Sequence, residues 1–228
     1  MYKHFFKRIF DIVSSGMALI VLSPILLYTA YLVKTRLGSP VLFTQIRPGK
    51  DGKLFRMYKF RSMTDERDAE GNLLPDDVRL TEFGKKLRAT SADELPELIN
   101  IFKGDMSVVG PRPQLVRDMV FFTEEEMQRQ SVYPGLTGLA QICGRNNITW
   151  KEKFAFDLQY IKDISFLKDM RIIFRTVFKV SAQEDIATDG METAEDYGDW
   201  LLRTGQIEKE EYDKKQAEAK KMLDEYSI

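Results

Sequence analysis

The chain has 228 residues, with 34 Lys and Arg, 35 Asp and Glu, and a net charge of −1. This length suffices for one or two domains with a buried core. The single cysteine, Cys143, excludes an internal disulfide and is expected to be a small core residue. The single histidine, His4, near the N-terminus, excludes a Ser-His or Cys-His nucleophile in the main body and argues against a His-rich zinc site. Any catalytic group is therefore expected to be a carboxylate, and any metal ion a hard one such as Mg²⁺ or Mn²⁺.

An uncharged run from Ile12 to Val33 predicts a segment that enters a membrane. At 1.5 Å per residue it is about 33 Å long, enough to cross a hydrocarbon core of about 30 Å. Cations flank both ends, however, which favours keeping both ends on the cytoplasmic side, and Ser23-Pro24 in the middle favours a bend. Two interpretations stay open: a re-entrant helix that enters and leaves on one side, and a transmembrane helix with a proline kink. A signal peptide is disfavoured because no small-residue cleavage site follows.

The charge is unevenly distributed along the chain. Residues 1–63 carry 11 Lys and Arg against 2 Asp and Glu, a net charge of +9, which leaves −10 for the remainder. Such a basic N-terminal part suits an anionic lipid surface. From Glu184 onward there are 14 acidic against 6 basic residues.

The middle of the chain alternates short strands, helices and turns. A hairpin is predicted around the turn Arg47–Gly52, and a loop is expected at Thr64–Arg79. Ser91 and Glu94 fit a capping box that opens a helix ending at Gly104. The full set of expected elements is strands Val41–Ile46, Leu54–Phe60 and Met106–Val109, helices Leu80–Ala89, Ser91–Phe102, Gln114–Gln130, Thr149–Lys162 and Ser165–Val180, and a glycine-rich loop Pro134–Arg145.

The later helices are amphipathic. In Ser165–Val180 the cations lie opposite the apolar residues, so this helix suits either the membrane interface or a protein core with its cations in water. Glu208–Tyr226 has the composition of a surface helix or a partly ordered tail. The expected fold class is α+β, with a membrane anchor over residues 1–37, a catalytic domain over residues 38–185 and an acidic tail over residues 186–228.

Asp93 and Glu94 are the candidate reactive groups. Their alternative role is structural, since acids are favoured in a first helical turn. Arg88 lies just upstream, Arg112 is held between two prolines and Arg145 lies in the glycine-rich loop, so several guanidinium groups can converge on one phosphate. A carboxylate among them is expected to have a lowered pKa and to be able to attack phosphorus. Neighbouring side chains on a helix point about 100° apart, which predicts different roles for Asp93 and Glu94.

The motifs that carry this chemistry occur together in a specific order. Together with Ser23-Pro24 they resemble the bacterial sugar transferases called small monotopic phosphoglycosyl transferases, over about residues 1 to 185. The motifs are Lys59-Phe60-Arg61-Ser62-Met63, Asp93-Glu94-Leu95-Pro96, Lys103-Gly104-Asp105-Met106-Ser107, Gly110-Pro111-Arg112-Pro113 and Pro134-Gly135-Leu136-Thr137-Gly138, followed by Asn146, Trp150, Asp157, Tyr160 and Asp169.

The resemblance implies an enzyme on the cytoplasmic face of the bacterial inner membrane. Such an enzyme moves a sugar-1-phosphate from a UDP-sugar to polyprenyl phosphate, releases UMP, uses Mg²⁺ and has no nucleic-acid partner. It implies a re-entrant N-terminal helix, a short hairpin and a helical catalytic domain with interfacial helices. The implied roles are Asp93 as the nucleophile and a metal contact, Glu94 at the metal or as a base, Arg88, Arg112, Arg145 and Lys59 at the phosphates, Gln141 and Asp157 at the nucleotide or a loop, Asp169 at the metal, and Ser23 and Pro24 at the bend.

Two rival functions remain. The same transfer can proceed directly in a ternary complex, with Asp93 only a base or metal ligand. Alternatively, the chain is a membrane-anchored scaffold whose acidic tail recruits glycosyltransferases.

Overall fold

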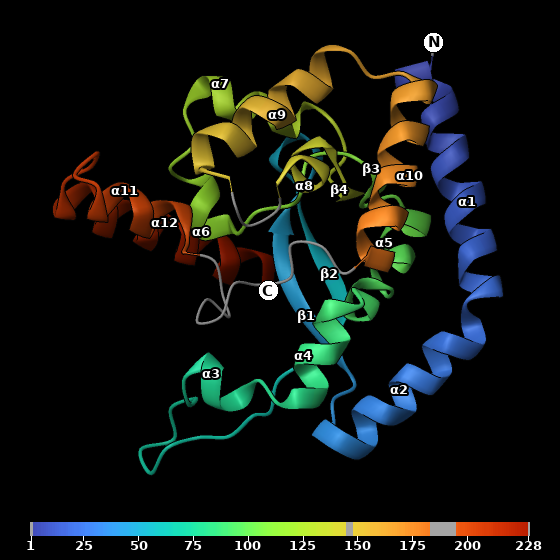
Figure 1. Ribbon diagram of the computed structural model, residues 1–228. Coiled ribbons are helices and arrows are strands. Elements are labelled where there is room, and N and C mark those ends of the chain that lie inside the picture. Colours follow the sequence, from blue (N-terminus) through green and yellow to red (C-terminus); the bar gives the residue numbers. More distant parts are fainter. Residues whose placement is uncertain (1, 145–147, 183–194, 228) are drawn as a thin grey trace.

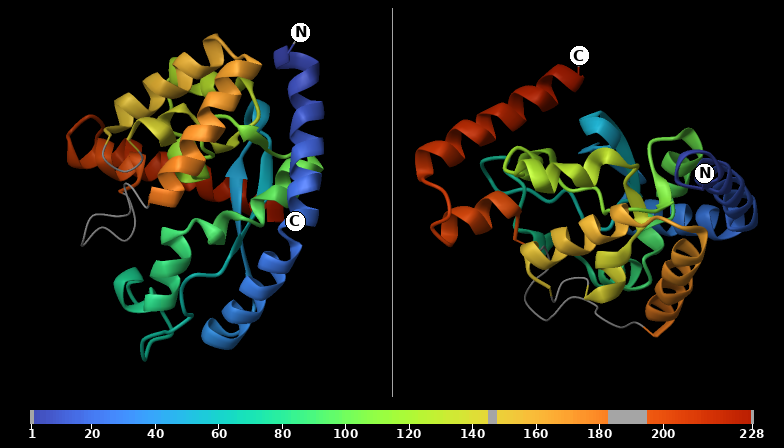
Figure 2. Two further views of the ribbon diagram at one scale, coloured as in Figure 1. Left: turned by 45° about the vertical axis from the view of Figure 1, so that its right-hand side comes forward. Right: turned by 90° about the horizontal axis from the view of Figure 1, so that it is seen from above.

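The computed structural model describes residues 2–144, 148–182 and 195–227. It combines helices with two small two-stranded sheets, which agrees with the expected α+β class. The N-terminal helices α1 (Lys7–Val21) and α2 (Ser23–Leu37) run along one side of the molecule, and α11 (Tyr197–Arg203) and α12 (Lys209–Ser227) lie on the opposite side (Figures 1 and 2).

Helices α1 and α2 meet at a bend of 64°. Pro24 lies in the first turn of α2, where its missing N–H costs little, and the Ser23 hydroxyl donates to the Ile20 carbonyl at 2.8 Å. Within the described ranges no single helix is long and apolar enough to cross a membrane, whereas the bent pair together meets that criterion of length and composition. The predicted break at Ser23-Pro24 is therefore present.

Helix α1 is attached to the body by polar contacts on its inner face. The Lys7 ammonium lies 2.6 Å from the Asp169 carboxylate, and the Asp11 carboxylate accepts the Val108 N–H at 2.9 Å. Arg8 donates to the Ile101 carbonyl at 2.8 Å. These contacts fix one face of α1 and leave its apolar face outward.

The predicted hairpin is confirmed as β1 (Leu42–Pro48) paired antiparallel with β2 (Leu54–Phe60). Its turn contains Asp51 at φ 56° and Gly52 at φ 73°, a left-handed region that glycine tolerates best. A second sheet pairs β3 (Ser107–Val109) in parallel with β4 (Gly135–Thr137).

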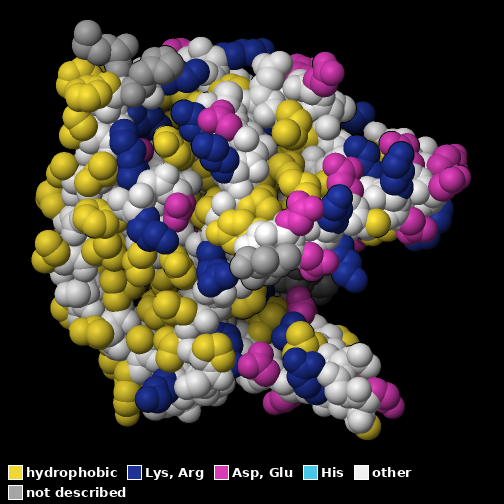
Figure 3. Space-filling view, turned by 180° about the vertical axis from the view of Figure 1, so that it is seen from behind, with side chains coloured by type: hydrophobic (Ala, Val, Ile, Leu, Met, Phe, Trp, Pro, Cys, Tyr) yellow, Lys and Arg dark blue, Asp and Glu magenta, His cyan; other side chains and the backbone are white. Residues whose placement is uncertain are grey.

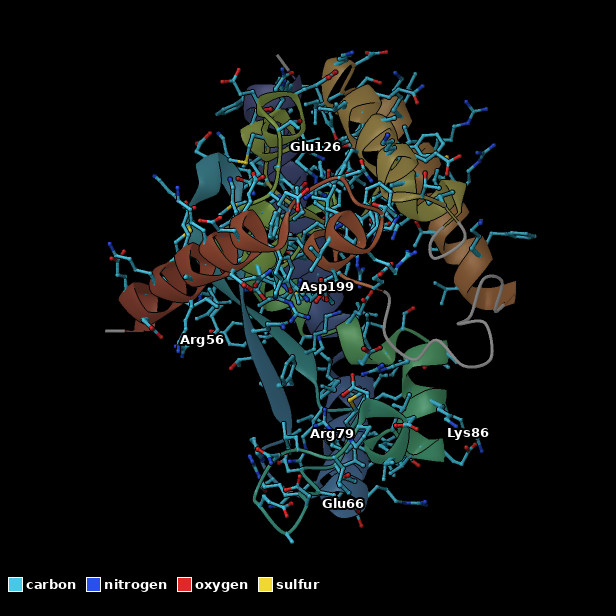
Figure 4. All side chains as sticks on the ribbon, turned by 90° about the vertical axis from the view of Figure 1, so that its left-hand side faces the viewer. Arg56, Glu66, Arg79, Lys86, Glu126 and Asp199 are labelled. Carbon is cyan, nitrogen blue, oxygen red and sulfur yellow. The ribbon has the colours of Figure 1, made fainter. Side chains whose placement is uncertain are left out.

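The remaining helices are mostly short, and 3₁₀ turns join several of them. The loop Thr64–Arg79 extends away from the body, with Glu66 and Arg79 in this region (Figure 4). The elements are α3 (Asp76–Arg79), α4 (Glu82–Ala89), η3 (Ala92–Glu94), α5 (Glu97–Lys103), α6 (Val116–Met119), α7 (Glu124–Met127), η4 (Gln128–Ser131), α8 (Leu139–Cys143), α9 (Trp150–Lys162) and α10 (Phe166–Ala182). The π-helical turn η1 (Tyr2–Phe6) lies at the start of the chain, and the 3₁₀ turn η2 (Lys50–Gly52) lies at the hairpin.

Several sequence predictions differ from this arrangement. The predicted loop Thr64–Arg79 ends in α3, and the helix predicted over Ser91–Phe102 is divided into the 3₁₀ turn η3 and helix α5. The helix predicted over Gln114–Gln130 is broken into α6, α7 and η4, because the Thr123 hydroxyl caps a new helix by accepting the Glu126 N–H. The glycine-rich loop contains β4 and α8. Cys143 is exposed, so its predicted place in the core is wrong: it ends the short α8 rather than facing inward.

The largest buried apolar cluster joins the C-terminal helices to the body. Tyr197 and Leu201 of α11 pack with Trp150 and Phe154 of α9, and Ala219 of α12 is 1% exposed in the same cluster. Of the two interpretations of Glu208–Tyr226, the surface helix agrees with the structure: most residues of α12 are exposed, and its inner side packs on the body.

Candidate functional site

Asp93 and Glu94 lie in η3, the 3₁₀ turn between α4 and α5. Ser91 adopts the left-handed region at φ 54°, and its side chain caps no N–H, so the predicted capping box is wrong. Pro96 then precedes α5, which Gly104 ends at φ 104° as predicted. The turn therefore positions the two carboxylates without the helix cap that would have given them a structural role.

Cations from two distant segments converge on Glu94. The Lys59 ammonium of β2 lies 2.8 Å from Glu94 Oε1, and the Arg112 guanidinium, from the loop after β3, lies 2.7 Å from the same oxygen. Arg112 keeps 43% of its side chain exposed, so an incoming anion can reach it. Asp93, next to Glu94, is 8% exposed.

The pKa values of the two neighbouring carboxylates are shifted in opposite directions. Burial, followed by repulsion from Glu94, raises the pKa of Asp93 to about 6, so the lowered pKa predicted from the sequence is wrong. For Glu94, burial favours the neutral acid, but attraction to Arg112 and Lys59 outweighs it and holds the pKa well below its usual range. Glu94 is therefore a permanent anion, whereas Asp93 is ionised at neutral pH and closer to protonation.

Arg88 lies on α4, on the side of Asp93. Its Nε donates to the Ser62 hydroxyl at 2.9 Å, and its charge lowers the pKa of Asp93. Three of the predicted phosphate-binding residues, Lys59, Arg88 and Arg112, thus act electrostatically on Asp93. Arg145 lies outside the described residues.

The other predicted site residues make contacts of a different kind. Gln141 donates to the Leu136 carbonyl at 2.9 Å and so holds the loop around β4. Asp157 forms a buried ion pair with Arg129 at 2.7 Å. Asp169 is 0% exposed and accepts from Tyr2, Lys7 and Tyr160. Because these contacts occupy both carboxylates, we do not include Asp157 or Asp169 in the proposed substrate and metal sites.

Glu97 is a member of the cluster that the sequence interpretation missed. Its carboxylate lies 3.3 Å from the Lys59 ammonium and is 3% exposed, and its Oε1 accepts no hydrogen bond among the described residues. Burial, followed by repulsion from Glu94, raises the pKa of Glu97 to about 7. The available signal was its position in the first turn of α5, three residues after Glu94.

Replacing Glu97 by Gln is expected to flatten the dependence of stability on pH. Between the ordinary pKa of 4.5 and the raised value of about 7, the folded protein holds a proton that the unfolded chain releases, so the free energy of unfolding falls as pH rises. Gln has no proton to lose. Denaturant unfolding of both proteins between about pH 5 and about pH 8 measures the two slopes. Equal slopes would show that Glu97 is already ionised in the folded state.

The described residues contain no group of three or more His, Cys, Asp or Glu side chains placed to hold a metal ion. The site instead offers two adjacent carboxylates, Asp93 and Glu94, surrounded by Lys59, Arg88 and Arg112. Such a combination can bind phosphate oxygens through the cations while a carboxylate faces the phosphorus.

An apolar surface lies on the side of α1 and α2. Exposed side chains there include Met17 at 61%, Ile20 at 76%, Leu27 at 72% and Tyr31 at 63%. Figure 3 shows apolar side chains gathered along one edge of the molecule, with basic side chains beside them. Exposed apolar residues on α10 have the same character, namely Phe166, Leu167, Phe174, Val177 and Phe178.

Comparison with known proteins gives consistent matches. A family model described as bacterial sugar transferase matches residues 2–183. The chain is 50% identical over 189 residues to the uncharacterized sugar transferase EpsL of Bacillus subtilis, covering 83% of this chain and 94% of EpsL.

Two further relatives have names that state a reaction. The UDP-glucose:undecaprenyl-phosphate glucose-1-phosphate transferase of Klebsiella pneumoniae is 45% identical over 187 residues, covering 76% of this chain and 40% of that protein. The undecaprenyl-phosphate galactose phosphotransferase of Salmonella typhimurium is 39% identical, covering 79% of this chain and 41% of that protein. The chain thus spans less than half the length of these two relatives.

Proposed function

This chain belongs to the bacterial sugar transferase family, and we propose that it transfers a sugar-1-phosphate from a UDP-sugar to undecaprenyl phosphate through a covalent intermediate on Asp93. The observation that carries the proposal is the pair Asp93 and Glu94 beside Lys59, Arg88 and Arg112. The reaction would serve the start of polysaccharide synthesis, in line with a relative named exopolysaccharide production protein PSS, from Rhizobium leguminosarum.

In the first step, an Asp93 carboxylate oxygen attacks the phosphorus that carries the sugar. A bond forms between this oxygen and the phosphorus, the bond to the oxygen bridging the two phosphates breaks, and UMP leaves with that oxygen. Arg112 and Lys59 offset the negative charge of the diphosphate. The raised pKa of Asp93 supports this role because a more basic carboxylate is a better nucleophile, and it is still ionised at neutral pH.

In the second step, a phosphate oxygen of undecaprenyl phosphate attacks the same phosphorus. The bond to Asp93 breaks, the carboxylate is regenerated and the lipid diphosphate sugar forms. Glu94 is held anionic by Arg112 and Lys59, so its role in this step is to hold these two cations beside the reacting phosphorus. Because UMP leaves before the acceptor reacts, two mutually repelling anions need not occupy the site together, and ping-pong kinetics are expected.

The carboxylates of Asp93 and Glu94 fit a Mg²⁺ site completed by the substrate. Mg²⁺ prefers oxygen ligands and is often bound by one or two carboxylates together with substrate phosphates. When bound, the ion supplies positive charge at the phosphate oxygens.

Membrane association of the chain is supported by the bent pair α1 and α2. Many of its apolar side chains are exposed, and both ends of the pair carry cations. Lys3 precedes α1, Lys7 and Arg8 begin it, and Lys34 and Arg36 lie in the last turn of α2. We favour a re-entrant anchor on the cytoplasmic face of the bacterial inner membrane, because cations at both ends favour the same side and the bend of 64° is compatible with that arrangement. The exposed apolar residues of α10 suit the interface beside it.

Replacing Ser23 and Pro24 together by Leu is expected to move the N-terminus to the opposite side of the membrane. The substitutions restore a continuous apolar helix that is long enough to span. In a Cys143→Ser background, Lys3→Cys is expected to resist a membrane-impermeant maleimide in intact spheroplasts and to become reactive with the Leu substitutions. Lys53→Cys in the hairpin is the matched control and should react only after lysis. Labelling of Lys3→Cys without the Leu substitutions would establish an ordinary transmembrane helix.

The proposed function is tested by a screen of UDP-sugars with the purified protein and undecaprenyl phosphate. At least one sugar is expected to give UMP and lipid diphosphate sugar, and chelation of Mg²⁺ should abolish both. Failure of every UDP-sugar in protein that is folded and lipid-bound would favour the scaffold function.

A further inference from the structure

We propose that Arg129 is a positioning residue for Arg112. We also propose that the C-terminal helices help to hold Arg129 in place, because Tyr197 packs against the aromatic rings beside its guanidinium. The inference rests on the proposed function, in which Arg112 binds substrate phosphate. Arg129 contacts the backbone of Arg112 and has no contact with the reacting carboxylates among the described residues, so it would act through Arg112 alone.

Arg129 joins α9 to the loop that carries Arg112. It is 3% exposed; its Nη2 donates to the Arg112 carbonyl at 2.7 Å, and its Nε and Nη2 donate to Asp157 at 3.0 and 2.7 Å. From the other end, the Arg112 guanidinium reaches Glu94 at 2.7 Å. Arg112 therefore connects the buried Arg129–Asp157 pair, through its carbonyl, to Glu94, through its guanidinium. Glu94 is the neighbour of the candidate nucleophile Asp93.

The geometry indicates more than a contribution to stability. A buried ion pair can often be replaced by apolar side chains at little cost in stability, because desolvation of the two charges offsets their attraction. Apolar side chains, however, have no N–H to donate to the Arg112 carbonyl. The Arg129–Asp157 pair therefore supplies an N–H donor, held in a fixed position, for the Arg112 carbonyl.

The neighbouring rings of Phe122 and Phe154 lie beside the guanidinium of Arg129. Its Cζ lies 5.5 Å from the Phe122 ring centroid and 5.6 Å from that of Phe154. Tyr197 of α11 contacts both rings, at centroid distances of 5.9 and 5.0 Å. Tyr197 lies beyond residue 183, where the match to the family model ends, so a segment outside that match supports a residue within it.

Further contacts fix Tyr197 to the segment that follows Arg112. Its N–H donates to Asp118 of α6 at 2.8 Å, and its hydroxyl donates to Glu126 of α7 at 3.0 Å. Asp118 is 1% exposed, and Asp196 forms an ion pair with Arg117. Figure 4 shows α11, which carries Asp199, beside α12 and in front of the body.

The decisive experiment is a double-mutant cycle between the buried pair and Arg112. Arg129→Met together with Asp157→Leu leaves no unpaired charge and is expected to lower kcat/KM for the UDP-sugar by about tenfold to a hundredfold, since small displacements of positioning groups have effects of this size. In an Arg112→Ala background the same substitutions should cause no further loss. A merely structural role would give the same fold-change in both backgrounds and would overturn the inference.

A second variant decides the question if that protein does not fold. Arg129→Lys keeps a cation beside Asp157 but lacks the planar guanidinium that serves both partners, so it is expected to lower kcat/KM in the same non-additive way. Full activity of Arg129→Lys would contradict the inference.

The contribution of the C-terminal helices is tested on α11. Tyr197→Leu removes the ring that contacts Phe122 and Phe154, and it should lower kcat/KM several-fold, again without effect in Arg112→Ala. Leu201→Ala, buried in the same helix and cluster, is the matched control and should lower the melting temperature without that kinetic change. If Tyr197→Leu and Leu201→Ala lowered kcat/KM equally, α11 would contribute to stability alone. If Arg112→Ala itself retains full activity, the proposed role of Arg112 fails instead.

Discussion

Replacing Asp93 by Asn is expected to lower the rate of UMP release by at least about 10³-fold, since the variant lacks the attacking carboxylate and single-nucleophile substitutions have effects of this size or larger. Asn has nearly the same shape, and the positions of Glu94, Lys59 and Arg112 should be preserved. The measurement is UMP release by purified protein in lipid nanodiscs, with UDP-sugar and undecaprenyl phosphate.

Asp163→Asn is the matched control for this substitution. Asp163 lies between α9 and α10 with 69% of its side chain exposed, so its loss should leave the rate near that of the unmodified chain. An Asp93→Asn protein that retained most of its activity would exclude both the covalent mechanism and any essential role of Asp93 as base or metal ligand.

Replacing Lys7 by Met is expected to destabilise the protein by about 3–5 kcal/mol, the usual effect of removing one partner of a buried ion pair. Asp169 is 0% exposed and would be left buried without the ammonium at 2.6 Å. Because Lys7 belongs to α1 and Asp169 to α10, the loss should also loosen the anchor from the body. Denaturant unfolding in a fixed detergent measures the change.

The double variant Lys7→Met with Asp169→Asn separates the ion pair from other effects. The Tyr2 and Tyr160 hydroxyls donate to different oxygens of Asp169, at 2.7 and 2.8 Å. Asn carries no charge; its oxygen can accept from one hydroxyl, and its NH₂ group can donate to the oxygen of the other. Most of the lost stability should return. A Lys7→Met protein within about 1 kcal/mol of the original, the usual range for exposed ion pairs, would show that this pair is solvated.

Much of the site was predictable because its residues lie in short, ordered motifs. Ser23-Pro24 predicted the bend through local backbone chemistry, and the turn at Arg47–Gly52 predicted the hairpin. The family was also evident from the motifs around Asp93 and Arg112, and the comparisons confirm it. In each case the signal depends on residues near one another in the sequence.

The rest depended on contacts between distant residues. Asp157 and Asp169 looked like candidate ligands on amphipathic helices, and only the fold shows Arg129 and Lys7 beside them. The pKa of Asp93 was misjudged because burial outweighs the neighbouring cations. Glu97 was overlooked because its contact with Lys59 joins α5 to β2.

The most direct test of the central claim is intact and peptide mass spectrometry after the protein is mixed with a UDP-sugar and Mg²⁺ without undecaprenyl phosphate. The covalent mechanism predicts release of about one UMP per protein, a mass increase equal to one sugar-1-phosphate on Asp93, and loss of this adduct when undecaprenyl phosphate is added. UMP released only in the presence of undecaprenyl phosphate, with no adduct in fully active protein, would establish direct transfer in a ternary complex and contradict the proposal.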